Sequence, residues 1–430
     1  MSAVSRRVRI CALSFLTAYA FSGLCAHAQA KPDEKSSPTA APPAKTIDGE
    51  RFPMTISPLT WSLLGTGIYP VKASDGKIHL AYTLLFTNSW PRSATLKTIE
   101  VVDPARGNQV TGQNKVLSLK NEDVTSLFRS FTLPPTMSWT NYSANLAGGR
   151  SAVMYFDVTY DDAVKVPRAI AHRIEVTTSD AQGNSTDYTA ISEPLAVSST
   201  EAFVLAPPLK GDGWVDGNGC CLEIGPHRYT ANTINGSLLV NENFAVDWIQ
   251  VDSEGKAFKD DAAVLKNWFA YGSDILAAGA GTVVEALDGV PDTEIGKAPD
   301  NLKLSTVGGN HVTIDMGEGR FAMYAHLIPG SVTVHAGDHV ERGQKLGLLG
   351  NSGNSDAPHL HFQLMDRPGS LEGTSLPFVF DSMELQGRIT LTMDELFRGV
   401  TKGLAVPIDR KATGLLKHMM PLTMDVVNFK

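Results

Sequence analysis

The 430-residue sequence predicts a mainly β protein, in which an N-terminal antiparallel β-sandwich of Ig-like type is followed by a second antiparallel β-sheet domain. Three observations lead to this prediction. Strand-like apolar runs end near Asn, Asp, Pro or Gly, as strands bounded by turns do. No long run has the 3.6-residue period of a helix. The Pro- and Gly-rich stretch Ala206–Gly219 separates two groups of strands and marks a domain boundary.

The first 30 residues are typical of a signal peptide. The arginine-rich start Arg6–Arg9 precedes the apolar run Ile10–Cys25, which is short for a membrane span. Small-residue cleavage motifs end at Ala28 and at Ala30. We therefore expect an exported protein, periplasmic or extracellular, with no transmembrane segment after cleavage.

Residues 31–48 are rich in Pro, Ala and Lys and predict a flexible linker. Removal of residues 1–30 takes three of the 37 basic residues and none of the 45 acidic ones, so 34 − 45 gives the mature chain a net charge of −11. This acidity, with a charged fraction of 19%, argues against a nucleic-acid partner.

Residues 49–203 form the predicted sandwich. The longest strand-like runs in it are Lys77–Asn88, Ala94–Val102, Ser151–Tyr160 and Ala169–Ser179. Several strands with turn signals over about 150 residues are typical of an antiparallel sandwich. No catalytic constellation lies among them, so the domain is either a spacer or fold support, or a docking surface for substrate or partner.

The most informative stretch, Pro358–Leu364, lies in the second domain, residues 204–386. Side chains of a strand alternate between two faces, so His359, His361 and Gln363 share one face while the apolar residues between them share the other. Neutral imidazoles on one face can bind a metal or move a proton. The plain alternative is a strand whose polar face happens to hold histidine.

Further motifs accompany this strand in a fixed order. Asp247 comes first, Tyr324–Leu327 contains Tyr-x-His-Leu, and Gly337–Gln344 and Gly350–Ser355 are glycine-rich turns. Taken together, this set resembles the M23 (LytM/lysostaphin-type) zinc metallopeptidases over roughly residues 205 to 385.

The resemblance implies bound Zn²⁺ with Asp247 and His361 as ligands. It also implies that His326 and His359 polarise the attacking water and stabilise the transition state. Zinc held by about three protein ligands keeps a position for water and lowers the pKa of that water to about 7. The implied activity is that of a zinc metalloendopeptidase, with peptidoglycan or a peptide as its substrate.

The sequence departs from the family pattern beside Asp247. The family has His four positions before this Asp, and here the residue is Asn243, a poor zinc ligand. Gln363 stands where the family usually has Glu. Either another residue replaces the missing imidazole or the site is degenerate. We expect Asn243, Gln363 and His311 to surround the ligands, with a purely structural role for His311 left open.

His227 is the candidate replacement. Asn235–Gly236 predicts a two-residue hairpin loop, so that positions whose numbers sum to 471 pair and His227 falls opposite Phe244, beside Asn243. Strict alternation puts His227 on the wrong face, and a single β-bulge would correct this. The alternative is a surface histidine beside Arg228.

Two further features lie near the ends of this domain. Signal cleavage leaves Cys220 and Cys221, which form either a vicinal disulfide or two free thiols. The C-terminal tail, residues 387–430, contains a helix candidate at Met393–Val400 and a strand candidate at Met424–Phe429. The sequence leaves open whether this tail packs on the sandwich.

Three functions are compatible with these patterns. The first is the exported zinc metalloendopeptidase. The second is a non-catalytic M23-like module that binds the cell wall or activates a cell-wall hydrolase partner, for which Asn243 is the main support. The third is a carrier domain, because Gly337–Gln344 resembles biotinyl and lipoyl hairpins, but the turn Gly350–Ser355 has no lysine. The joint presence of the Asp and three His of the motif favours the first.

Overall fold

The computed structural model describes residues 46–47, 50–51, 54–112, 129–130, 144–221, 227–229, 231–297 and 302–430. Thr46–Lys430 forms one compact unit built mainly of strands. Its described strand pairs are antiparallel except for one parallel pair, which confirms the predicted mainly β fold class. The predicted signal peptide lies outside the described residues, and so does most of the predicted linker. None of the helices in the described part has the length and apolar character of a membrane span.

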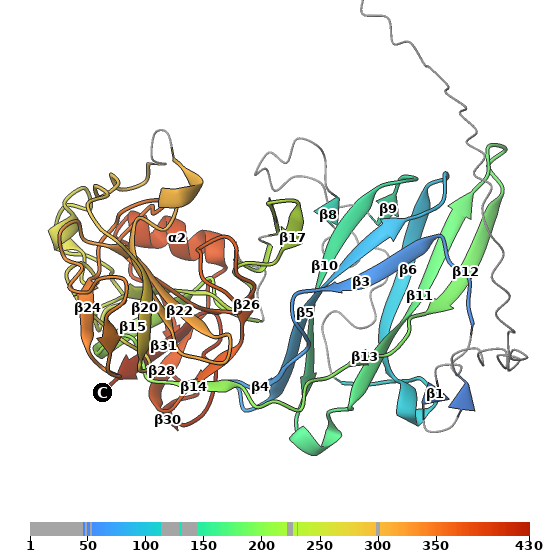
Figure 1. Ribbon diagram of the computed structural model, residues 1–430, viewed down its shortest axis with the longest axis horizontal. Coiled ribbons are helices and arrows are strands. Elements are labelled where there is room, and N and C mark those ends of the chain that lie inside the picture. The colour runs from blue at the N-terminus through green and yellow to red at the C-terminus, as the bar shows by residue number, and fades with distance from the viewer. Residues whose placement is uncertain are drawn as a thin grey trace, which may run out of the picture. The chain divides into compact units, whose positions relative to one another are not determined.

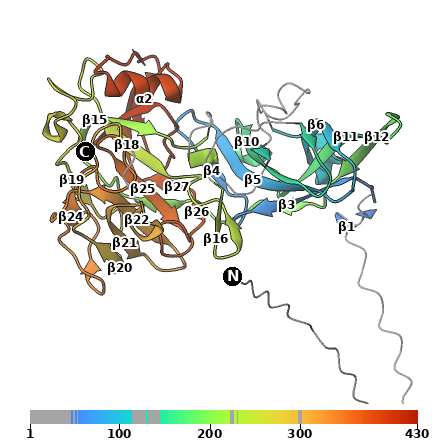
Figure 2. The same ribbon diagram turned by 90° about the horizontal axis from the view of Figure 1, so that it is seen from above.

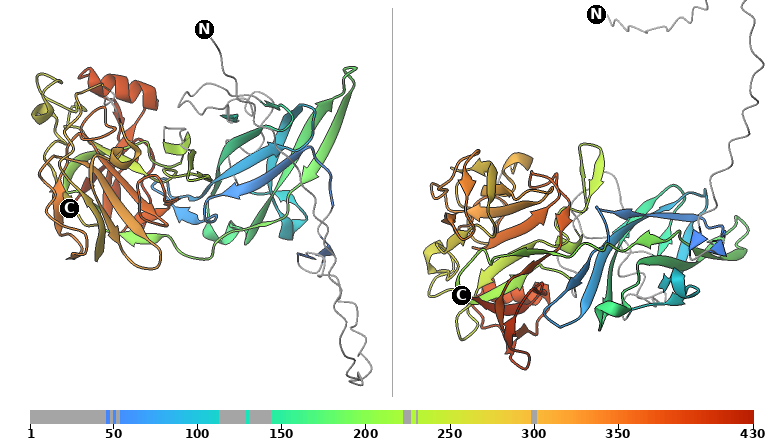
Figure 3. Two further views of the ribbon diagram at one scale, coloured as in Figure 1. Left: turned by 45° about the horizontal axis from the view of Figure 1, so that its top comes forward. Right: turned by 60° about the horizontal axis from the view of Figure 1, so that its bottom comes forward.

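Two antiparallel sheets form the N-terminal part (Figures 1 and 3). One has the order β3-β5-β10-β8 with β4 added to β5, and the other has the order β12-β11-β6-β7 with β13 and β9 at its edges. The strands of the first sheet are β3 (Leu59–Leu64), β4 (Pro70–Lys72), β5 (Ile78–Asn88), β8 (Arg129–Ser130) and β10 (Ser151–Tyr160). Those of the second are β6 (Ala94–Asp103), β7 (Gln109–Val110), β9 (Asn145–Leu146), β11 (Ala169–Ser179), β12 (Ser185–Ile191) and β13 (Leu195–Ala196). Short strands β1 (Thr46–Ile47) and β2 (Glu50–Arg51) pair before them.

Strand β5 is buried on both faces. Leu80, Tyr82 and Leu84 belong to a core shared by the two sheets, so this part is a sandwich. The alternate residues, including Ala81 and Thr83, are buried as well. A solvated face would expose every second residue, so the second domain covers this face. The Ig-like connectivity of the sandwich stays a prediction.

A second apolar cluster joins the two domains. Ala81 of the sandwich packs in it with Phe244 and with Cys220 and Cys221 of the second domain. The two cysteines form a vicinal disulfide. Strand β14 (Phe203–Leu205) links the domains and pairs in parallel with β27 (Phe378–Phe380).

The second domain is built on one twelve-stranded sheet with the order β23-β20-β21-β22-β25-β18-β15-β31-β28-β29, to which β26 is added at β25 and β30 at β28. Figure 2 shows its central strands side by side. The strands on the motif side are β18 (Val246–Gln250), β20 (Gly281–Leu287), β21 (Asn310–Asp315), β22 (Phe321–Leu327), β23 (His339–Val340), β25 (Leu360–Met365) and β26 (Ser375–Leu376). The others are β15 (Gly211–Gly217), β28 (Met383–Ile389), β29 (Ile408–Asp409), β30 (Gly414–Leu416) and β31 (Asp425–Phe429). A separate pair is formed by β19 (Asp274–Leu276) and β24 (Lys345–Leu348).

The Asn235–Gly236 hairpin has the predicted register, because β16 (Asn232–Ile234) and β17 (Ser237–Leu239) pair at positions that sum to 471. The predicted extension of this pairing to His227 is wrong. After β17 the Val240 carbonyl accepts from Ser375 N–H instead, and the Asn241 side chain donates to the carbonyls of Leu371 and Gly373. His227 lies in a 3-10 turn, η3 (His227–Tyr229).

The remaining 3-10 turns are η1 (Pro104–Arg106), η2 (Ala163–Lys165), η4 (Leu265–Asn267) and η5 (Leu304–Thr306). The helix in the tail, α2 (Met393–Thr401), begins at Thr392, whose side chain forms a capping box with Glu395. The tail returns to the large sheet through β31, which pairs with β15 and β28. Met420 also exchanges backbone hydrogen bonds with Lys72 and Ser74 of the sandwich.

Candidate metal and catalytic site

Two neighbouring strands bring Asp247 and His361 together. β18 and β25 are antiparallel, and Asp247 pairs directly with His361. The alternate residues Trp248, Leu360 and Phe362 point into the apolar core, so the two polar side chains share the opposite face. Asp247 Oδ1 lies 3.0 Å from His361 Nδ1. The predicted alternation of the His-x-His strand therefore creates this pair.

His227 completes a group of three. Its Nε2 lies 3.3 Å from Asp247 Oδ2, and its ring lies 5.0 Å from that of His361. The Nδ1–H of His227 donates to the carbonyl of Ala245 at 3.1 Å, which leaves Nε2 as the free ligand atom. Ligand atoms of the three residues all lie within 4.8 Å of one another. Two imidazoles and a carboxylate suit Zn²⁺, so the residues present fit the implied metal.

His359 and His326 lie beside this group. His359 Nε2 is 3.4 Å from Asp247 Oδ1, and the ring centroids of His359 and His326 are 4.7 Å apart. The Nδ1–H of His359 donates to the carbonyl of Ala357 at 2.7 Å, and that of His326 donates to the carbonyl of Ser352 at 2.7 Å. In both histidines Nδ1 is therefore occupied, and Nε2 is the ring nitrogen that can contact water or a substrate.

His326 has a left-handed backbone, with a φ of 67° near the end of β22. This conformation costs a non-glycine residue about 1–3 kcal/mol. Hydrogen bonds hold it there, because His326 N–H donates to Gly308 and its carbonyl accepts from Gly350 N–H. The glycine-rich turn predicted around residue 350 therefore helps to aim this side chain.

These side chains line a cleft of about 580 Å³. One wall is formed by the loops that carry Gly308 and Asn354, and another by the tail helix α2, through Phe397, Arg398 and Thr401. The described part of the sandwich contributes none of the lining residues. The tail therefore shapes the cleft, although the sequence patterns did not connect it with the site.

Opposing effects set the charges of the group. Burial alone would raise the pKa of Asp247, but His227, His359 and His361 hold that pKa well below its usual range. Burial works against the protonated form of His361, yet the hydrogen bond and charge of Asp247 raise its pKa. Burial, followed by repulsion from His359 and His361, lowers the pKa of His326 well below its usual range. The His326 imidazole is thus neutral at pH 7.

The three residues expected around the ligands have different positions. Asn243 is directed at the sandwich and not at the group of His227, Asp247 and His361. Its Nδ2 donates to Thr83 Oγ1 of the sandwich at 2.8 Å. Gln363 is fully buried beside His361, and its amide contributes to raising the pKa of that residue. His311 donates from Nδ1 to the Gly309 carbonyl at 2.8 Å and does not line the cleft.

Two neighbours of the group were not anticipated. Asn218 Nδ2 donates to Asp247 Oδ2 at 2.7 Å from a backbone with a φ of 58°. The sequence Gly217-Asn218-Gly219 is a turn signal that could have pointed to this conformation. Glu242 lines the cleft, and its charge contributes to raising the pKa of His361.

The fold and the site together define an antiparallel β protein with a His/Asp cluster in a cleft. Residues 267–372 match Peptidase family M23, which confirms the predicted resemblance. This match includes His326, His359 and His361. Asp247 and His227 precede it.

Two curated proteins show local similarity. The chain is 42% identical over 59 residues to the peptidoglycan DD-endopeptidase ShyA of Vibrio cholerae. These 59 residues are 14% of this chain and 13% of that protein. It is 39% identical over 64 residues to an uncharacterized metalloprotease of Buchnera aphidicola, which covers 15% of this chain and 16% of that protein. The matched stretches thus span less than a fifth of these relatives.

Two solved structures are similar to part of the chain. The catalytic domain of the prophage-encoded M23 protein EnpA from Enterococcus faecalis, in a mutant form, has 20% identity and a TM-score of 0.24, covering 40% of this chain and 92% of that one. The catalytic domain of lysostaphin from Staphylococcus simulans has 22% identity and a TM-score of 0.21, covering 39% and 88%. Both similarities cover less than half of this chain.

Proposed function

We propose that this protein is an exported zinc metalloendopeptidase that hydrolyses peptide bonds, with periplasmic or extracellular peptidoglycan as its substrate. The observation that carries the proposal is the group His227, Asp247 and His361, whose ligand atoms lie within 4.8 Å of one another at the cleft. His326 and His359 lie beside it. A structural or purely adhesive surface has no evident need for this arrangement.

His227 Nε2, Asp247 and His361 would hold the zinc, which supplies Lewis acidity and activates water for attack on a peptide carbonyl. His326 is neutral and keeps Nε2 free, so it is suited to accept the proton of that water and to return it to the leaving amine. In its doubly protonated form His359, next to the Asp247 carboxylate, can donate from Nε2 to the carbonyl oxygen as negative charge develops. Both histidines line the same cleft.

The non-catalytic alternative rested on Asn243. The closeness of His227 to Asp247 and His361 supports a third ligand from outside the family motif, and Asn243 has a separate contact with Thr83. No observation on the described residues therefore favours a binding or activator module over an enzyme.

The test is digestion of purified peptidoglycan by the full mature chain, followed by mass analysis of the released fragments. We expect new peptide termini with the parent protein, their loss after chelation, and their return on addition of Zn²⁺. His361→Ala is the matched inactive control. A parent that binds one zinc per chain and cuts neither peptidoglycan nor its isolated stem peptides would overturn the proposal.

A further inference from the structure

We infer that the β-sandwich is a positioning domain for the metal site, and that Arg228 acts through its neighbour His227 to hold the third ligand in place. The inference rests on the proposed zinc site and adds to it a role for a domain outside the region matched to family M23. His227 and Arg228 lie in the same three-residue turn, η3, so a contact of one constrains the other.

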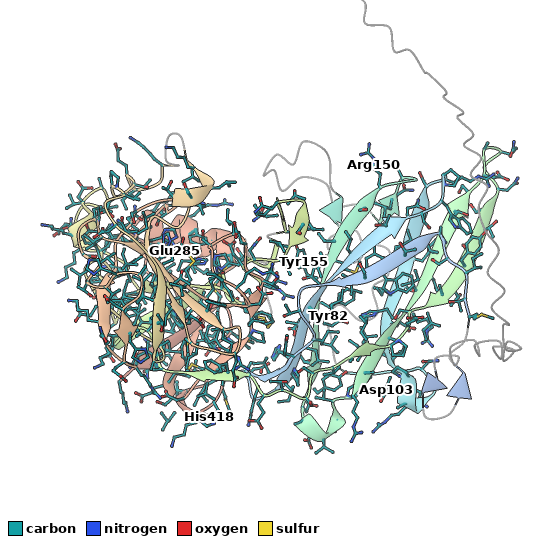
Figure 4. All side chains as sticks on the ribbon, in the orientation of Figure 1. Tyr82, Asp103, Arg150, Tyr155, Glu285 and His418 are labelled. Carbon is teal, nitrogen blue, oxygen red and sulfur yellow. A yellow bond between two sulfur atoms is a disulfide. The ribbon has the colours of Figure 1, made fainter. Side chains whose placement is uncertain are left out.

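Arg228 is anchored in the sandwich. Only 3% of its surface is exposed, and its Nη2 donates to the carbonyl of Phe156 on β10 at 3.0 Å. The guanidinium also lies over the ring of Tyr155, 6.0 Å from its centroid. Figure 4 labels Tyr155 on β10 and Tyr82 on the neighbouring strand β5. A buried guanidinium held by a carbonyl and a ring face is a fixed anchor rather than a solvated charge.

Asn243 is attached to the same part of the sandwich. It donates to Thr83 Oγ1 on β5, and Thr83 pairs directly with Tyr155 of β10. The turn that carries His227 and the segment that leads to Asp247 are therefore both attached to one rung of the sandwich sheet. The apolar cluster of Ala81, Phe244 and the cysteine pair packs next to this rung.

The sandwich contributes more to the position of His227 than to the positions of the other two ligands. Asp247 and His361 belong to central strands of the large sheet, where the backbone ladder fixes them. His227 belongs to no strand, and its own domain holds its ring through the Ala245 carbonyl. Groups that orient a metal ligand from outside typically change metal affinity about 10–100-fold when removed.

The experiment measures the zinc dissociation constant of the full mature chain by competition with a chelator, beside circular dichroism to confirm folding. Arg228→Ala is expected to raise this constant about 10–100-fold, and Arg228→Lys to recover part of the loss. Thr83→Val, which removes only the hydroxyl that Asn243 contacts, is expected to raise it several-fold. Arg173→Ala, which removes the arginine paired with Glu100 elsewhere in the sandwich, should leave it within twofold of the parent.

A double-mutant cycle separates positioning from general destabilisation. In a His227→Ala background, Arg228→Ala should change the zinc dissociation constant less than twofold, because the residue through which it acts is gone. Equal losses in both backgrounds, or no loss in the parent background, would overturn the inference. A parent that binds zinc but hydrolyses nothing defeats the proposed function alone, since the positioning of His227 is measured by metal binding.

Discussion

Asn243 Nδ2 lies 2.8 Å from Thr83 Oγ1, so the position where M23 peptidases carry a histidine ligand is used here to attach the large sheet to the sandwich. In the proposed site the nitrogen ligand comes instead from His227, in a turn 16 residues before Asn243 (243 − 227). The two changes are complementary, because the segment that bears Asn243 and the turn that bears His227 contact the same pair of strands, β5 and β10.

This exchange predicts that Asn243→His does not restore a site that lacks His227. Asn243 is 4% exposed and directed at the sandwich, so a larger ring there loses the Thr83 contact and crowds a packed interface. We expect the single variant to lose about 1–3 kcal/mol of folding free energy in urea unfolding. We also expect Asn243→His combined with His227→Ala to bind zinc no better than His227→Ala alone. Recovery of parental zinc affinity by the combined variant would show that position 243 faces the metal.

Much of the strand structure follows from local patterns. The runs predicted at Ser151–Tyr160 and Ala169–Ser179 coincide with β10 and β11, because clear turn residues bound both. The Asn235–Gly236 loop also has the predicted register. The hairpin could not be extended to His227 from the sequence, since the competing bonds of Asn241 come from residues more than 130 positions away.

In the candidate site, too, local patterns predict the strand residues but not the contacts between residues that are distant in the sequence. Period-two alternation is enough to place His359, His361 and Gln363 on one face, and the order of motifs indicates Asp247 and His326. The conformation of His227 depends on contacts of Arg228 with another domain, which no local pattern encodes. Likewise, the wall formed by α2 depends on how the tail folds back across β15.

The ligand role of His361 and the oxyanion-stabilising role of His359 predict separable effects for the two histidines of the His-x-His strand. His361→Ala removes a ligand, so both zinc content and hydrolysis should fall. His359→Ala should keep about one zinc per chain and lower the hydrolysis rate about 10²–10³-fold, the usual effect of losing one hydrogen-bond donor to a developing oxyanion. Elemental analysis and a peptide-cleavage assay measure the two quantities. His335→Ala, at a side chain that is 89% exposed, is the control. Equal zinc loss in His359→Ala and His361→Ala would contradict this assignment of roles.

The cap of α2 links stability of the tail to the cleft. Thr392 accepts a hydrogen bond from Glu395 N–H at the start of the helix, while Phe397 and Thr401 of the same helix line the cleft. Thr392→Ala should cost about 1 kcal/mol of folding free energy. Because the helix that forms this wall of the cleft is then less stable, we expect KM for a peptide substrate to rise. The zinc content should stay unchanged. Thr392→Ser, which keeps the hydroxyl, should behave like the parent in both measurements.

The interface between the domains predicts a pH dependence of stability that is independent of the metal. His79 is 1% exposed, with Nδ1 2.9 Å from Asp157 and Nε2 3.2 Å from Asp75. Burial alone would lower its pKa, but the two carboxylates raise the pKa of His79 to about 9 from an ordinary value of 6.5. Since the folded-state pKa is the higher one, the stabilisation is complete below pH 6.5 and is lost as the pH rises through about 9.

Urea unfolding of the metal-free protein should therefore show a decrease of about 1–3 kcal/mol in folding free energy between about pH 6 and pH 9.5. Chelator is kept present throughout, because metal binding has a pH dependence of its own. His79→Gln removes one titrating group and should reduce the slope in this range, at a lower stability at the acidic end, while the raised pKa of His361 keeps its own contribution. His335→Gln, at an exposed histidine, should keep the parental slope. If His79→Gln also keeps that slope, the pH dependence arises elsewhere, and the charge of His79 does not stabilise the contact between sandwich and sheet.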